Sequence, residues 1–244
     1  MNEMLFYDLR ESPGLAYSLS AQVAREIGRR IVSGTYAPDQ LIEDEQKLSE
    51  RYRVSRSVIR DAVKVLVGKG LLEVRRGIGT RVRPRSSWGL LDDDVLAWHH
   101  SAPSNPEFLR QLMDIRKIIE PKAARWAAER GSAEDLEQIG QALAAMRKTS
   151  ETQDDFIISD ARFHQSILQA ANNEFLLAMQ GIIFLGLLYS LRVTNPDTES
   201  NVRSIPLHEN VYEAVRQGDG DAAEHRMDLL MSDASSRLSL KASG

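Results

Sequence analysis

The chain has 244 residues, of which 42% are hydrophobic, enough for one large or two modest domains with cores. It contains no cysteine, which excludes a disulfide framework and a thiolate metal site. The net charge of −4 is unevenly divided: residues 17–85 carry 15 Lys and Arg against 8 Asp and Glu, whereas residues 86–244 carry 15 against 24. This asymmetry predicts a basic module joined to an acidic one.

The start of the chain, MNEMLFYDLRESPG, lacks the basic residues and the long apolar run of a signal peptide. The longest apolar stretch, 176–191, is interrupted by Gln180 and Ser190 and is shorter than the roughly 20 residues that span a bilayer. We therefore expect no membrane contact and a cytoplasmic protein, in which this stretch forms a buried helix.

The N-terminal part predicts three helices. Residues 18–33 repeat apolar side chains at helical spacing, and Gly34 follows as a residue that ends helices. A short helix capped by Asp44 is expected within 42–54, and a third begins after Ser55, a good N-cap residue.

Two short β-like runs, 71–76 and 80–84, then lie on either side of a glycine turn. Three helices followed by a β-hairpin is the order of a winged helix-turn-helix, whose third helix enters the major groove of DNA. The sequence therefore predicts such a domain over residues 17–85.

The third predicted helix keeps Arg56 and Arg60 off its apolar face, near its N-terminal end, where acidic residues are more usual. Arginine binds guanine and phosphate well. An alternative is a surface helix whose arginines form salt bridges with Asp61, Glu50 and similar residues. The charge of the domain and the arginines of the hairpin favour DNA binding instead. These arginines are Arg75, Arg76, Arg81, Arg83 and Arg85.

This stretch resembles the DNA-binding domain of the GntR family of bacterial transcription regulators. The matching positions are Glu45, Leu48, Val54, Ser55, Arg56, Arg60, Gly77, Ile78, Gly79 and Thr80. The resemblance implies that DNA contacts fall on Gln46, Ser55, Arg56, Ser57, Arg60 and Gly77. Relatives often have arginine at position 46, and glutamine there can pair with adenine or a phosphate. Because two half-sites need two recognition helices, we expect a homodimer on double-stranded operator DNA.

Residues 86–106 are rich in residues that break regular structure, and they predict a linker with one short helix. From 107 to 240 the periodicity is helical throughout, which predicts an antiparallel bundle. The fold class is therefore mainly α, with an N-terminal winged helix-turn-helix domain and a C-terminal all-helical bundle. The bundle helices are expected at 106–131, 132–149, 152–172, 173–193, 201–218 and 219–240.

Polar residues at apolar positions indicate a site inside the bundle. Asp160 and His164 are four residues apart, hence on one helix face, and a carboxylate with an imidazole is a natural metal pair. His208 could supply a third ligand.

Arg116 is a cation among apolar residues of the first bundle helix. It could receive the carboxylate of a ligand, or it could pair with Asp114 or Glu120.

The helical half resembles the FCD domain, the ligand domain of FadR-type GntR regulators, over nearly all of residues 107–238. Its D-x-x-F-H motif runs here from Asp160 to His164, and a later histidine motif begins at His208. The resemblance implies that these three residues hold a divalent metal (zinc, or nickel or manganese). An effector carboxylate would complete the metal's shell beside Arg116.

Relatives have one more histidine ligand, at the position that is Leu230 here. His225 lies about 140° around the helix from that position and is no substitute. Two states therefore remain open: a weakened metal bridged by the effector, or a metal-free pocket in which the same side chains hydrogen-bond a polyol.

The leading prediction is a ligand-responsive DNA-binding regulator, a repressor released from its operator by a small carboxylate, a sugar acid, with no catalytic residues. One alternative is a metal-dependent enzyme in which Asp160, His164 and His208 activate water, although no general base clusters with them in the sequence. The other is an acyl-CoA or fatty-acid sensor, which would need a long apolar tunnel and not these polar groups.

Overall fold

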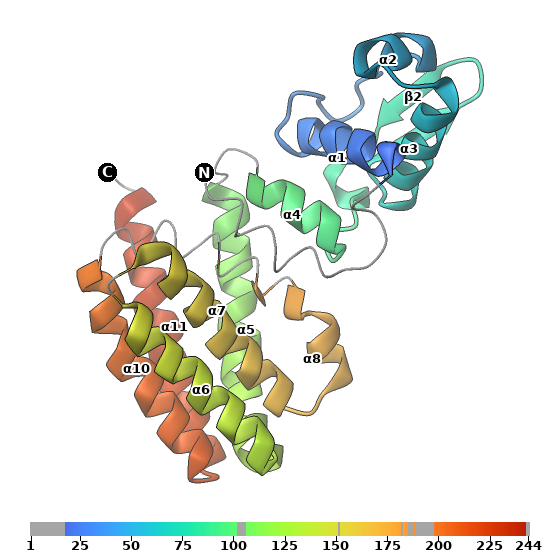
Figure 1. Ribbon diagram of the computed structural model, residues 1–244. Helices are drawn as coiled ribbons and strands as arrows, with labels where there is room; N and C mark the ends of the chain where they lie inside the picture. Colours follow the sequence, from blue (N-terminus) through green and yellow to red (C-terminus); the bar gives the residue numbers. More distant parts are fainter. Residues whose placement is uncertain are drawn as a thin grey trace. The chain divides into compact units, whose positions relative to one another are not determined.

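The computed structural model describes residues 18–101, 106–150, 152–181, 183, 184, 188 and 198–242. The chain divides into two compact units, Met1–Ser104 and Asn105–Gly244, each described below by itself (Figure 1). In these described parts, no helix combines the length and apolar character needed to cross a bilayer.

The N-terminal unit is a winged helix-turn-helix, as the sequence predicts. Its elements are α1 (Leu19–Val32), α2 (Glu45–Tyr52), α3 (Arg56–Gly68), β1 (Leu72–Arg75) and β2 (Gly79–Val82). The apolar faces of the three helices meet in one core, where Ile27, Ile59 and Leu66 are fully buried. Burial of these faces is the main stabilising contribution to such a small unit.

Side-chain caps determine where the helices begin. Asp44 accepts a hydrogen bond from the backbone N–H of Lys47, and Ser55 accepts one from that of Val58, so both predicted caps are present. Between α2 and α3 the backbone of Arg53 is left-handed, with φ 54°. The Ser49 hydroxyl closes this turn by donating to the Val54 carbonyl at 2.5 Å.

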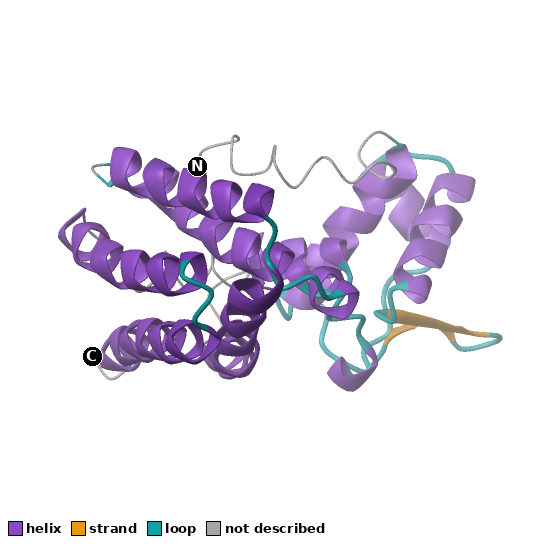
Figure 2. Ribbon diagram, turned by 90° about the horizontal axis from the view of Figure 1, so that it is seen from below, coloured by secondary structure: helices purple, strands orange, loops and turns teal. Residues whose placement is uncertain are grey.

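The two strands form an antiparallel hairpin in which Leu72 pairs with Val82 and Arg75 pairs with Gly79. Figure 2 shows this wing reaching out from the helices of its own unit. Gly77 lies in its turn with φ 77°, a conformation that glycine adopts without strain.

The segment expected as a linker contributes to the core of the N-terminal unit. It contains α4 (Asp93–Ser101), which packs on α1, and both Trp88 and Trp98 are buried in the same core as α3. The Trp88 indole donates to the Arg83 carbonyl at 2.9 Å. Lys69, after the end of α3, donates to Asp92 at 2.6 Å and forms an ion pair with Asp94 at 2.8 Å.

The C-terminal unit is all-helical in its described parts, as predicted. Its helices are α5 (Pro106–Arg130), α6 (Ala133–Thr149), α7 (Gln153–Ala170), α8 (Glu174–Ala178), α10 (Thr198–Arg216) and α11 (Gly220–Ala242). The long helices lie side by side, with α5 and α10 packed on α11 and α6 packed on α7 (Figure 1). Fully buried side chains such as Phe156, Phe163 and Ile139 fill the space between them.

One helix expected in this unit is shorter than its periodicity suggests. The prediction was a single helix over 173–193, but α8 ends at Ala178 with Met179 as its C-cap, and helix resumes at Gln180. Part of the predicted range lies outside the described residues. The predicted burial is also wrong for much of the run: α8 has no buried residue, and of the described residues in 176–191 only Ile183 and Leu188 are buried. The apolar composition of a run by itself marks neither an internal helix end nor the face that another helix covers.

Candidate functional site

The exposed surface of α2 and α3 brings together most of the residues expected to contact DNA. Gln46, Ser55, Ser57, Arg56 and Arg60 are all exposed. Arg56 Nη2 donates to Gln46 Oε1 at 3.1 Å, and the hydroxyls of Ser55 and Ser57 are 2.8 Å apart. Gly77 lies in the wing turn instead, and nothing lies within 4 Å of where a Cβ would stand, so its backbone is open to approach.

Both arginines of α3 contact side chains of α2, and Arg60 forms a salt bridge of the kind that the alternative expects, although with neither of the two acidic residues named there. Arg60 Nε donates to Glu45 Oε2 at 2.7 Å, whereas Asp61 pairs with Lys64 and Glu50 accepts from Gln46. Exposed ion pairs of this kind contribute only about 0–1 kcal/mol. Exchange of these partners for a phosphate or a base edge therefore costs little.

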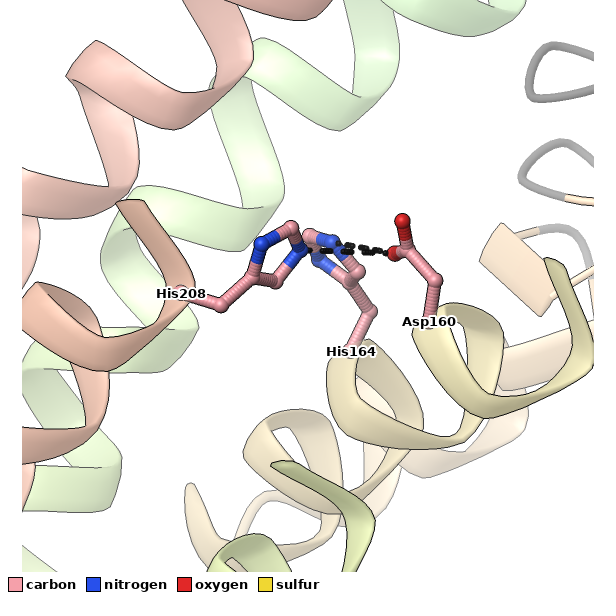
Figure 3. A group of neighbouring side chains, drawn as sticks. All are labelled: Asp160, His164 and His208. Atoms are coloured by element: carbon pink, nitrogen blue, oxygen red, sulfur yellow. Dashed lines mark ion pairs between the residues drawn. The ribbon is translucent and has the colours of Figure 1, made fainter. Parts of the chain in front are cut away.

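Inside the helical unit, α7 and α10 bring three predicted ligands together. Asp160 and His164 share one face of α7, and His208 reaches them from α10 (Figure 3). Asp160 Oδ1 lies 3.2 Å from His164 Nε2 and 3.4 Å from His208 Nε2. Each residue is only 2% exposed, and their ligand atoms all lie within 4.8 Å of one another.

The outer nitrogens of the two imidazoles determine where their protons lie. His208 Nδ1 is 2.8 Å from the Ser204 carbonyl, which can only accept, so Nδ1 carries the proton. His164 Nδ1 lies against a carboxylate oxygen of Glu120 and must donate for the same reason. In their neutral forms, both rings therefore direct the lone pair of Nε2 towards Asp160.

Three electron-rich atoms thus converge on one buried point. Asp160 Oδ1 and His208 Nε2 have no hydrogen-bond partner. Burial of such groups without compensation costs several kcal/mol. Two imidazole nitrogens and one carboxylate oxygen are the donor set that zinc and similar divalent metals take in proteins. These residues therefore fit the implied metal, and Asp160, His164 and His208 are the residues that would hold it.

A proton on His164 is the competing way to neutralise this point. Burial lowers the pKa of His164, but the carboxylates of Glu120 and Asp160 outweigh it and raise the pKa to about 9. The pKa of Asp160 is held well below its usual range, because His208 and His164 outweigh the effect of burial. Metal and proton therefore compete for the lone pair on His164 Nε2.

Arg116 pairs with Glu120, one of the two partners considered from the sequence. Its Nε donates to Glu120 Oε1 at 2.5 Å, and the two side chains are 2% and 1% exposed. Asp114, the other candidate, pairs with Arg110 at 2.8 Å. Burial raises the pKa of Glu120, but Arg116 and His164 bring it down to about 2, so the carboxylate is ionised.

Two features of this polar region were missed in the sequence: the contact of Glu120 with His164 and the burial of Asn201. Glu120 contacts His164 from 44 residues away, a contact that no local pattern encodes. Asn201 is fully buried on α10; its amide nitrogen donates to the Ser150 carbonyl at 3.4 Å, while its Oδ1 has no partner. The polar run Asn201, Ser204 and His208 along one face of a helix was a usable signal.

Neither of the two positions considered for a fourth ligand joins the cluster. Leu230 is buried and His225 is exposed on α11. Among the described residues, the group able to hold a metal consists of Asp160, His164 and His208.

Comparison with known proteins matches both units. Residues 19–82 match the family described as "Bacterial regulatory proteins, gntR family", and residues 111–233 match the FCD domain. The "Galactonate operon transcriptional repressor" of Escherichia coli (strain K12) is 33% identical over 213 residues, which are 87% of this chain and 93% of that protein. The "HTH-type transcriptional regulator LutR" of Bacillus subtilis (strain 168) is 30% identical over 202 residues, 81% of this chain and 90% of that protein.

A solved structure of Lar from Listeria monocytogenes shares the fold, with a TM-score of 0.66 at 18% identity over 92% of this chain and 98% of that one. The matched proteins are regulators of transcription, which confirms the prediction of a regulator and not an enzyme. The chain belongs to the gntR family of bacterial regulatory proteins and carries an FCD domain C-terminal to its DNA-binding domain.

Proposed function

We propose that the protein is a homodimeric repressor of an operon for sugar-acid catabolism. It binds operator DNA in the cytoplasm and is released when a sugar acid enters the helical unit. The similarity to a galactonate operon repressor makes D-galactonate the first candidate effector.

The observation that carries this proposal is the buried convergence of Asp160, His164 and His208, with two acceptor atoms left without partners. A helical unit that served only as a scaffold would gain stability from apolar residues at these positions. A divalent metal bound there supplies positive charge, which favours the carboxylate and hydroxyl oxygens of a sugar acid.

Other buried polar atoms suit a polyol. Asn201 Oδ1 has no partner, and it lies on the same face of α10 as His208. A hydroxyl group is a donor of the right kind for this oxygen. An acyl chain offers no such donor and would leave the charges of the cluster uncompensated, so an acyl-CoA sensor has no support here.

Burial of the cluster suggests how the effector acts. Because its three ligands are each 2% exposed, entry of an effector requires α7 and α10 to move relative to each other or to α5. A ligand that binds only the opened arrangement shifts the protein towards it. The resulting change in the packing of the helical unit would be how the effector alters DNA binding by the N-terminal unit.

In the DNA-binding unit, we propose that Gln46, Ser55, Arg56, Ser57 and Arg60 enter or flank the major groove and that Gly77 lets the wing approach a phosphate. The support is their exposure and the low cost of releasing Arg56 and Arg60 from α2. One chain presents one recognition helix, so a two-fold operator requires two copies.

The test is a calorimetric titration of zinc-loaded and chelator-treated protein with aldonic, uronic and keto-deoxy acids. D-Galactonate should bind the zinc-loaded protein and release it from the DNA beside its own gene in a gel-shift assay. Galactitol, which lacks the carboxylate, is the matched control and should do neither.

Comparison of the zinc-loaded protein with the chelator-treated protein distinguishes a metal-bridged site from a metal-free one. Loss of binding after chelation supports the metal bridge, and undiminished binding shows direct hydrogen bonding to a protonated His164 instead. Binding by none of the acids, in either arm, would refute the assignment of the effector class.

A further inference from the structure

Glu120 occupies the centre of the buried polar chain. One carboxylate oxygen accepts from Arg116 Nε at 2.5 Å, and the other lies against His164 Nδ1. The residue is 1% exposed, so water does not compete for either oxygen. It comes from α5, whereas His164 comes from α7, so the contact joins two helices.

The contact with Arg116 alone does not account for this arrangement. Arg116 and Glu120 are four residues apart on α5, and one oxygen satisfies the Nε donor. The second oxygen is directed at the ring nitrogen of His164 that faces away from Asp160. A carboxylate accepts at both oxygens and donates at neither, so this nitrogen must carry the proton.

Histidines that bind metals commonly donate their other ring N–H to a carboxylate, which orients the ring and makes the free nitrogen more basic. We propose that Glu120 is the positioning residue of the metal site, because it keeps the proton of His164 on Nδ1 and the lone pair on Nε2. This inference rests on the metal site proposed above for Asp160, His164 and His208.

The isosteric variant Glu120→Gln tests this directly. Arg116 must still donate, so the amide oxygen of the new side chain stays on Arg116 and the amide NH₂ faces His164 Nδ1. That nitrogen then becomes an acceptor, and the proton of the neutral ring moves to Nε2. From there it donates to Asp160, 3.2 Å away, and blocks the place of the metal.

The measurement is the zinc affinity of the full chain, from titration against a competing chelator. Glu120→Gln should bind zinc about 10–100-fold more weakly than the wild type, the usual effect of losing such a partner. The control is Glu134→Gln, which makes the same chemical change at an exposed position of α6 and should bind as the wild type does.

A second readout excludes a general loss of structure. Nitrogen-15 spectra of the imidazoles, with His164 assigned by its absence in His164→Asn, show which nitrogen carries the proton. The wild type should have a protonated Nδ1 with and without zinc, and Glu120→Gln a bare Nδ1. A bare Nδ1 in the zinc-loaded wild type would overturn the proposal even if Glu120→Gln failed to fold.

The outcomes also separate this inference from the proposed metal site. Equal zinc affinity of the wild type and Glu120→Gln overturns the role of Glu120 and leaves the metal site standing. Absence of zinc binding by the wild type itself overturns the metal site, and the role of Glu120 falls with it.

Discussion

At the scale of single residues, His99 and His164 show how neighbouring charges decide whether the pKa of a buried histidine is lowered or raised. Both are buried, and burial by itself lowers the pKa of a histidine. Two carboxylates raise the pKa of His164 to about 9, whereas His99, buried near Arg85, has its pKa lowered to about 4. His99 is therefore neutral in the folded N-terminal unit, with its ring 6.2 Å from that of Trp88.

His99 should make the N-terminal unit sensitive to acid. Its pKa when folded, about 4, lies below its ordinary value of 6.5, so its contribution to stability is full above pH 6.5 and is lost as the pH falls towards 4. Between pH 7 and pH 5 this loss is about 2 kcal/mol. Thermal unfolding across this range should show a shallower pH dependence for His99→Phe than for the wild type.

The matched control is His225→Phe at an exposed position of α11, which should keep the slope of the wild type. An equal slope in His99→Phe would show that His99 is not the group that titrates.

At the scale of elements, α3 is the recognition helix proposed to enter the major groove. Arg56→Ala and Arg60→Ala should each weaken operator binding by about 1–3 kcal/mol, the range for a good side-chain contact to a base. Both residues are exposed, so the fold should be unaffected. A gel-shift titration measures the effect, with Arg162→Ala on α7 as the control. Operator affinity as tight as that of the wild type in both variants would contradict the placement of α3.

The packing of α4 on α1 depends on a small residue. A Cβ at Gly28 would stand 2.4 Å from the Trp98 ring, so Gly28→Ala should destabilise the N-terminal unit by about 1–3 kcal/mol through overpacking. Gly68, near the end of α3, has nothing within 4 Å of its Cβ position. Gly68→Ala should therefore stabilise the same unit by about 0.4–1 kcal/mol.

Denaturant unfolding followed by tryptophan fluorescence measures both changes. The opposite signs make the pair diagnostic, because both variants add one methyl group to a helix. If Gly28→Ala were as stable as Gly68→Ala, α4 would not be held on α1.

At the scale of the whole molecule, the division of charge should dominate the response to salt. The net positive charge lies in residues 17–85, which carry 15 Lys and Arg against 8 Asp and Glu, although the chain as a whole has a net charge of −4. A protein that neutralises about six phosphates loses roughly 10³-fold in affinity between 50 and 200 mM salt. We expect a loss of this size for the operator, measured by fluorescence anisotropy. An operator affinity that did not change with salt concentration would show that phosphate contacts contribute little to binding.

Most of the fold could be predicted from the sequence, because it depends on interactions between residues that are close together along the chain. Helix periodicity, the caps Asp44 and Ser55 and the glycine turn of the wing act over a few residues, so their outcome can be read from neighbouring positions. The Asp160–His164 pair is local for the same reason, because four residues complete about one helical turn. The same reasoning was wrong for 173–193, where α8 ends at Ala178 within a mainly apolar stretch.

Only the tertiary structure decided how distant side chains meet. The contact of Glu120 with His164, the burial of Trp98 against Gly28 and the convergence of two lone pairs on Asp160 all join separate helices. Such contacts depend on how helices pack, and periodicity specifies which face is buried but not what it is buried against. The sequence thus determined which residues are able to bind a metal or a ligand, and the packing of the helices decided which of their atoms lie close together.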